Sequence, residues 1–166
     1  GNVLDQEAIT IRHKYMRYGL RTNIDAEVKP WLTVSAKLNG SVLHKKNTTP
    51  NWFHVLNYSP TMELKDATSG IYNKDPYNIL SNNPYGVVME TDSDNYGYTL
   101  NANMQLLFRI VKGLTLSVQG GYDITHSPSY SFVSSNVASG ATSSMSNKSA
   151  LHQYWQNTNN LTYSNT

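Results

Sequence analysis

The sequence predicts an all-β protein built from antiparallel β-hairpins. Three observations support this fold class. Four stretches of the chain alternate between apolar and polar residues, these stretches are longer than most strands of soluble proteins, and their connections are alternately very short and very long. Together they predict that residues 1–166 are a segment of a large transmembrane β-barrel with long extracellular loops.

The first predicted hairpin pairs strands near residues 16–28 and 32–43. Its charged residues, Arg17, Arg21, Asp25, Glu27 and Lys37, all lie at odd positions. Side chains of a strand point alternately to its two faces, so each strand has one charge-free face and one polar face. The charge-free positions are Met16, Tyr18, Leu20, Thr22, Ile24, Ala26, Val28, Leu32, Val34, Ala36, Leu38, Gly40 and Val42.

The second predicted hairpin repeats this pattern with strands near residues 96–110 and 114–125. Between them, Val111-Lys112-Gly113 is typical of a three-residue hairpin loop, in which Gly113 can adopt the positive φ that such loops need. A fifth strand is expected near residues 153–163. The charge-free positions of the second hairpin are Tyr96, Tyr98, Leu100, Ala102, Met104, Leu106, Phe108, Ile110, Leu114, Leu116, Val118, Gly120, Tyr122 and Ile124.

The length of these runs favours a membrane barrel. Each run covers 11 to 15 residues, whereas strands of soluble proteins most often have about 5–6 residues and a tilted strand crosses a bilayer with roughly 9–11. A charge facing lipid at mid-membrane costs about 2–4 kcal/mol, which explains a face without charge. The pattern leaves one alternative open, a soluble or secreted β-sandwich that binds carbohydrate, because the core face of a sandwich also excludes charge.

The connections are the second line of evidence for a barrel. Short turns join the strands within each hairpin, whereas residues 45–95 and 127–151 form two long predicted loops. Outer-membrane barrels have this asymmetry between their two ends, and compact soluble domains rarely contain such long connections. Aromatic residues near the strand ends would then form girdles at the membrane interfaces. These residues are Tyr15, Tyr18, Trp31, Tyr96, Tyr98 and Tyr122.

The composition excludes several other functions. The net charge is +2 and no run of Lys and Arg exceeds two residues, so we expect no nucleic-acid partner. The chain has no cysteine, its five histidines show no ligand spacing, and no phosphate-binding or catalytic motif stands out. We therefore expect no enzymatic activity, no metal site and no cofactor. The chain opens on Gly1 and stops inside an alternating stretch, which is expected of a piece of a longer protein.

The first long loop contains the candidate substrate-binding residues. It combines aromatic side chains with asparagines and with four of the six prolines of the chain. Aromatic rings stack on the apolar faces of sugars, and amides supply paired donors and acceptors for hydroxyl groups. The alternative is that these rings pack the loop against itself or against a partner. The candidates are Trp52, Phe53, Tyr58, Tyr72, Tyr77 and Tyr85.

Several motifs together resemble a known family. The run from Met16 to Asp25 contains Arg17-Tyr18-Gly19-Leu20-Arg21-Thr22-Asn23-Ile24-Asp25 and is followed closely by Trp31-Leu32. This hairpin resembles the "RYxLRxNxD" strand and the "WL" strand of the SusC/RagA group of TonB-dependent outer-membrane transporters. Asn83-Pro84, Ile110-Val111-Lys112-Gly113-Leu114 and Gly120-Gly121-Tyr122-Asp123 are similar to further motifs of that group.

This resemblance implies a function for a longer parent protein. Members of the group are large barrels with an N-terminal plug in the outer membrane of Gram-negative bacteria. A SusD-like lipoprotein caps the barrel, TonB supplies energy, and the substrates are glycans or peptides. The chain would contribute barrel strands, with outer-membrane lipid on one side, and loops that face the substrate or the lipoprotein. As an isolated fragment it is expected to self-associate through its charge-free face.

Overall fold

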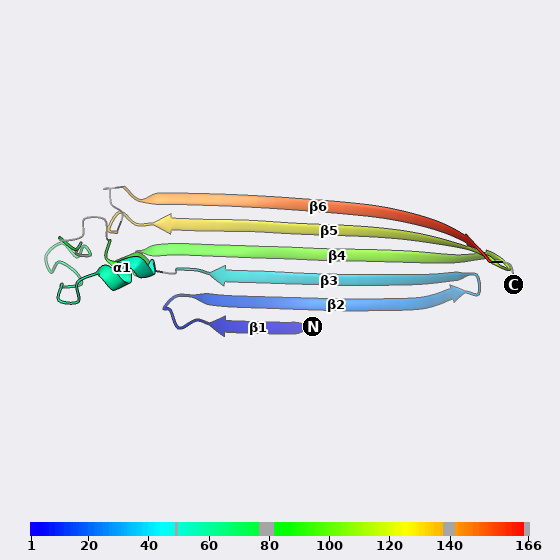
Figure 1. Cartoon of the computed structure of the whole chain (residues 1–166), viewed down its shortest axis with the longest axis horizontal. Coiled ribbons are helices and arrows are strands. Elements are labelled where there is room, and N and C mark those ends of the chain that lie inside the picture. The colour runs from blue at the N-terminus through cyan, green and yellow to red at the C-terminus, as the bar shows by residue number, and fades with distance from the viewer. Residues whose placement is uncertain (49, 77–81, 138–141, 165–166) are drawn as a thin grey trace.

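Six antiparallel strands form one sheet in the order β1-β2-β3-β4-β5-β6, so each strand pairs with its neighbours in sequence (Figure 1). The structure is a computed structural model that describes residues 1–48, 50–76, 82–137 and 142–164. It confirms the predicted all-β fold of antiparallel hairpins. The strands are β1 (Asn2–Glu7), β2 (Lys14–Lys29), β3 (Leu32–Lys46), β4 (Thr91–Val111), β5 (Leu114–Val133) and β6 (Ser144–Tyr163), and the helices are α1 (Trp52–Asn57) and α2 (Pro84–Glu90).

The sheet is a single layer that does not close on itself, and β1 and β6 are its edges. Among the described residues, the buried apolar side chains are Tyr72, Val88 and Val137, and all three lie outside the strands. The large apolar side chains of the strands therefore have no protein layer over them. A β-sandwich would need a second sheet packed on the first, and the described strands belong to one sheet.

The register places the charge-free positions of neighbouring strands on one side of the sheet. Tyr18 pairs with Val42, Val42 with Tyr98, and Tyr98 with His126. We call this side the apolar face: the even-numbered residues of β2 to β5 with the odd-numbered residues of β1 and β6 that pair with them. The opposite side is the polar face. In the described strands, acidic residues and lysines appear on the apolar face only beyond the Tyr18 row, at Asp5, Glu7, Lys14, Lys46, Asp92 and Asp94.

The two ends of the sheet differ, as the connections predicted. Short turns join β2 to β3 and β4 to β5 at one end, which we call the turn end. The connection 8–13 and the described parts of the connections 47–90 and 134–143 lie at the other end, the loop end, where Figure 1 shows α1. At the turn end, the Trp31 ring stacks on Phe108 with centroids 6.3 Å apart, and the Arg109 amide donates to the Trp31 carbonyl at 2.8 Å.

The strands extend further towards the loop end than the sequence predicted. Both ends of the predicted loop 127–151 belong to the sheet, because β5 continues to Val133 and β6 begins at Ser144. Similarly, β4 begins at Thr91 inside the predicted loop 45–95, which also contains the two helices. β1 was not predicted at all. The start of β4, from Thr91 to Asn95, is polar on both faces and so lacks the alternation by which the other strands were identified. In the outer part of β5 the alternation continues, with Pro128, Tyr130 and Phe132 at even positions, so the predicted strand ended too early.

We expect Gly113→Ala to destabilise the hairpin of β4 and β5. Gly113 has a φ of 84°, and an added Cβ would overlap the Ser164 carbonyl oxygen. An L-residue in this left-handed conformation costs about 1–2 kcal/mol, which urea unfolding followed by circular dichroism would measure. Gly120→Ala is the matched control, because its Cβ would meet no atom within 4 Å. Equal losses in the two variants would contradict this account of the turn.

Candidate functional site

The long connection between β3 and β4 folds into a compact cap at the loop end, organised by the side chain of Asn83. This side chain is only 2% exposed. Its oxygen accepts hydrogen bonds from the Tyr85 and Gly86 amides, both at 3.1 Å, and so caps the first turn of α2. Its nitrogen donates to the Tyr58 hydroxyl at 2.9 Å and lies 3.2 Å from the Leu64 carbonyl oxygen. One amide therefore joins three segments of the cap.

Two of the candidate aromatic residues are part of this packing. The Tyr72 side chain is 5% exposed and lies against Gly86, where an added Cβ would meet its ring. The Lys65 ammonium lies 4.3 Å from the centre of the same ring. The Tyr58 hydroxyl donates to the Asn73 carbonyl at 2.8 Å. Burial raises the pKa of Tyr58, the hydrogen bond from Asn83 lowers it, and the nearby charge of Asp75 raises it.

Arg12, which the sequence analysis did not single out, fastens the cap to the sheet. It lies in the connection of β1 and β2 with a φ of 62°. Its guanidinium donates to the carbonyls of Val88 and Met89 at the end of α2, and it forms an ion pair with Asp92. These are carbonyls that a helix end leaves without partners. No local pattern could have indicated this contact, because it joins residues 76 to 80 positions apart.

Two other candidates line an apolar groove on the cap. Trp52 and Tyr85 are 56% and 43% exposed, and they lie on a groove of about 300 Å³ between the β1–β2 connection, α1 and α2. Among the described residues, the side chains that line this groove are apolar or aromatic, apart from the hydroxyls of Thr10 and Tyr85. Its residues are Ile9, Thr10, Ile11, Pro50, Trp52, Val55, Pro84, Tyr85 and Val88.

The last two candidates lie elsewhere. Phe53 is 65% exposed and is not part of the groove, and its ring meets His54 edge-on at 5.9 Å. Tyr77 lies outside the described residues. The structure thus brings Trp52 and Tyr85 together at a surface site, while Tyr58 and Tyr72 support the cap from within.

The polar face carries connected amides and charges across the strands. The Asn39 amide donates to Asn101 at 3.3 Å, and the Asn101 amide donates to the Asp123 carboxylate at 2.6 Å. Nearer the turn end, Gln105 donates to the Ser117 hydroxyl at 3.2 Å. A polar hollow of about 280 Å³ lies on this face beside Lys37, and it can offer hydrogen bonds to a polar partner.

A row of stacked rings marks the place on the apolar face where charges begin. Ring centroids are 4.5 Å apart for His44 and Tyr96, 6.5 Å for Tyr96 and Tyr98, and 5.9 Å for Tyr98 and His126. We call these four residues the aromatic belt. Two residues of the predicted girdle are placed differently: Tyr15 pairs with Lys45 on the polar face, and Tyr122 pairs with Ala102 in the middle of the apolar face.

The described residues contain no cluster of three or more side chains that could hold a metal ion. No helix among the described residues is long and apolar enough to cross a membrane.

Comparison with known proteins identifies a solved fold of the same kind. No family model matches the chain, and no curated protein matches it at a significant level. The structure is similar to part of the solved RagAB peptide transporter, with a TM-score of 0.67 and 19% sequence identity over 91% of this chain. The match covers 18% of the transporter chain, so this chain spans less than a fifth of that length. At this identity the likeness shows a shared fold.

We expect Asn83→Ala to loosen the cap far more than Asn51→Ala, which removes the corresponding cap of α1. Loss of an N-cap costs about 0.5–2 kcal/mol. The Asn83 variant additionally removes the hydrogen bonds from its buried amide nitrogen to the Tyr58 hydroxyl and the Leu64 carbonyl, whereas Asn51 is exposed and its side chain accepts from the Phe53 amide. Limited proteolysis should cut the segment 50–90 faster in Asn83→Ala. Equal cutting of both variants would show that Asn83 does not organise the cap.

Proposed function

We propose that this chain forms part of the barrel wall of a TonB-dependent nutrient transporter of the SusC type in the outer membrane of a Gram-negative bacterium. Its apolar face lies against lipid, its polar face lines the lumen, and its cap lies outside the cell. The role is uptake and binding, without catalysis. The full-length parent would work with a SusD-like lipoprotein over the loop end and with TonB.

The height of the charge-free region on the apolar face is the observation that carries this proposal. On β3 it extends from Leu32 to Val42, ten residue steps, which is about 33 Å at about 3.3 Å per residue. A strand tilted by about 40° reduces this length to a height of about 25 Å, the height of the apolar band on outer-membrane barrels. The aromatic belt lies at the loop-end limit of this charge-free region, the position at which outer-membrane barrels have a girdle of aromatic residues.

The ends of the strands support the same orientation. β4 begins at Thr91, five residues beyond Tyr96 of the belt, and so continues for about 17 Å past the belt. The longer connections of outer-membrane barrels lie on the extracellular side, and the cap lies at this end of the sheet. The fold shared with part of the RagAB peptide transporter is consistent with this arrangement.

The chemistry of the groove favours a peptide over a glycan as its ligand. Sugar hydroxyls need paired donors and acceptors, and the groove is lined mainly by apolar and aromatic side chains. An extended peptide could place apolar side chains between Trp52 and Tyr85. The neighbour of known structure is a peptide transporter by its description, which agrees with this preference.

We expect Leu38→Lys to prevent assembly in the outer membrane and Asn39→Lys to permit it. The two residues are adjacent but point to opposite faces at the same height. A lysine facing lipid at mid-band costs about 2–4 kcal/mol, whereas a lysine in the lumen costs little. The measurement is made on the full-length parent with an antibody against this chain. The unchanged parent and Asn39→Lys should give a heavy outer-membrane band that shifts on boiling, and Leu38→Lys should not. If the unchanged protein instead gave a soluble band near 18.6 kDa, the transporter proposal would be excluded and the alternative of a soluble or secreted carbohydrate-binding protein would be favoured.

We expect Trp52→Ala and Tyr85→Ala to weaken peptide binding, because each removes a wall of the groove. Losing one large apolar contact of this kind corresponds to roughly 1.5–3 kcal/mol, or about tenfold to 150-fold in affinity. Titration of the parent with a mixture of tryptic peptides and, separately, with oligosaccharides would measure both ligand classes by calorimetry. Phe53→Ala is the control, since Phe53 is exposed outside the groove. Binding of oligosaccharides alone would reverse the assignment of the ligand.

A further inference from the structure

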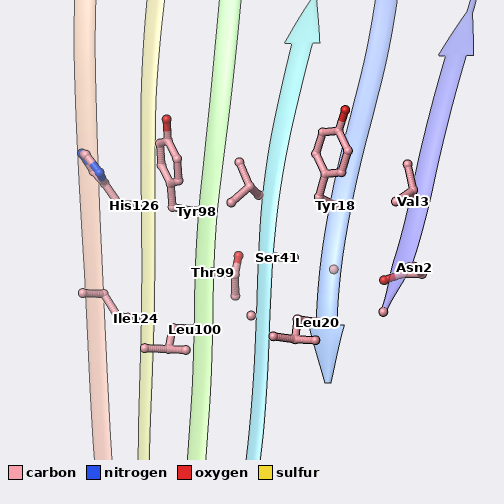
Figure 2. Close-up of a pocket in the computed structure, with 14 residues that line it drawn as sticks. Asn2, Val3, Tyr18, Leu20, Ser41, Tyr98, Thr99, Leu100, Ile124 and His126 are labelled. Atoms are coloured by element: carbon pink, nitrogen blue, oxygen red, sulfur yellow. The ribbon is translucent and has the colours of Figure 1, made fainter. Parts of the chain in front are cut away.

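The apolar face changes its chemistry beyond the level of Tyr98. Figure 2 shows this level beside an apolar hollow of about 550 Å³ that Gly40 lines, with the hydroxyls of Tyr18 and Tyr98 pointing towards the loop end. The paired residues that cross the six strands at this level are Val3, Tyr18, Val42, Tyr98, His126 and Leu151. Four residues further along each strand, the paired residues are Glu7, Lys14, Lys46, Asp94, Tyr130 and Asn147, which we call the outer row.

We propose that the outer row binds the core sugars of lipopolysaccharide, the glycolipid of the outer leaflet, on the outside of the barrel wall. The inference rests on the proposed function, which places the apolar face against the outer membrane and the loop end outside the cell. It goes further, because it assigns a carbohydrate ligand to a surface that takes no part in uptake.

The outer row lies at the height of the sugars. It is four residue steps from the level of Tyr98, which is about 13 Å along a strand and about 10 Å in height at a tilt of about 40°. The headgroup region on one side of a bilayer is about 5–8 Å thick. The side chains of the outer row therefore lie past the acyl chains, in the layer where the sugars of the glycolipid are attached.

Tyr130 presents a ring with hydrogen-bonding groups on both sides. It is 37% exposed and pairs with Asp94 on β4 and with Asn147 on β6. An aromatic ring covers the apolar face of a sugar, while a carboxylate accepts from sugar hydroxyls and an amide both donates and accepts. The Asp94 carboxylate is held by His44, whose Nε2 lies 2.8 Å away and whose ring stacks on Tyr96 at 4.5 Å.

Lys14 and Lys46 add donors to the same row. They pair directly across β2 and β3, and each ammonium group has three N–H donors. Their ion pairs are long, 3.4 Å from Lys14 to Asp5, 3.7 Å from Lys14 to Glu7 and 3.4 Å from Lys46 to Asp92. Strong charge-assisted hydrogen bonds are shorter, and exposed ion pairs stabilise a protein little. Sugar hydroxyls can therefore replace these carboxylates as acceptors at small cost.

The charges of the outer row favour neutral sugars over the phosphates of the glycolipid. Lys14 and Lys46 balance Glu7 and Asp94, so the row has no net charge. A phosphate would be attracted by the two lysines and repelled by the two carboxylates. Hydroxyl groups can use both, because each one donates as well as accepts.

The direction of the outer row selects a membrane-bound sugar over a free one. Its side chains lie on the apolar face, whereas a transported substrate would pass the polar face in the lumen. The sugars that stand beside the outside of the wall are those of the outer leaflet.

The test is a double variant of the full-length parent, Lys46→Gln with Tyr130→Ala. The matched control is Lys45→Gln with Tyr15→Ala, which changes the same residue types in a pair on the polar face. Each purified protein is titrated in detergent with lipopolysaccharide that has its core sugars, with lipopolysaccharide truncated to its phosphorylated lipid, and with the released core oligosaccharide. Surface plasmon resonance gives the dissociation constants.

We expect the unchanged parent and the control to bind core-bearing lipopolysaccharide about tenfold more tightly than the double variant does, since a ring and a charged donor are lost. All three proteins should bind the truncated lipid equally, and more weakly than the unchanged parent binds the core-bearing form. This comparison of ligands on the unchanged parent tests the proposal even if the double variant does not fold.

Three results would overturn the sugar site. They are equal binding of core-bearing lipopolysaccharide by all three proteins, binding of the truncated lipid as tight as that of the core-bearing form, and binding of the released oligosaccharide as tight as that of the whole glycolipid. The heat-shifted outer-membrane band of the unchanged parent would still uphold the proposed function in each case. Absence of that band from the unchanged parent would instead refute the proposed function.

Discussion

The pairing register of the sheet is the constraint on which the rest of the structure depends. Because side chains alternate between faces, a slip of one residue between two strands would bring Arg21 or Lys37 onto the side that carries Leu20 and Leu38. In the native register, the apolar face of β2, β3, β4 and β5 carries no charged side chain between the row of Tyr18 and Val42 and the turns. The aromatic belt, the hollow at Gly40 and the amide network of the polar face all follow from this one alignment.

Sequence alone predicted the strands wherever the two faces meet different environments. Leu32 to Val42 and Tyr96 to Ile110 alternate because one side excludes charge. The structure pairs these two strands with each other, a contact between the two hairpins that the sequence did not predict. Prediction failed at β1, where Val3 and Leu4 lie on opposite faces, and at the start of β4, where Asp92-Ser93-Asp94 is polar on both sides. These segments pair with neighbouring strands through the backbone and carry no periodic signal in their side chains. The outer part of β5 does carry one, in Pro128, Tyr130 and Phe132, and could have been predicted.

The sequence showed which residue types the cap contains, but it could not show which of them are buried and which lie on its surface. The aromatic residues of the loop were identifiable, yet only contacts in space separate Tyr72, which is buried against Gly86, from Trp52, which lies on the groove. Asn83 and Arg12 act through partners many positions away, such as Tyr58 and Asp92. Neither residue lies in a pattern that distinguishes it from other asparagines or arginines of the chain.

The strand order also determines how the number of strands in such a sheet can change during evolution. Each strand pairs only with the strands before and after it in the chain, so a hairpin is a complete unit of construction. A hairpin contributes two strands and returns the chain to the same end of the sheet with its neighbours unchanged. Duplication or deletion of a whole hairpin would therefore alter the circumference of a barrel without exchanging its inside and outside. Gene duplication by such units would give an evolving barrel a stepwise route to a wider or narrower pore.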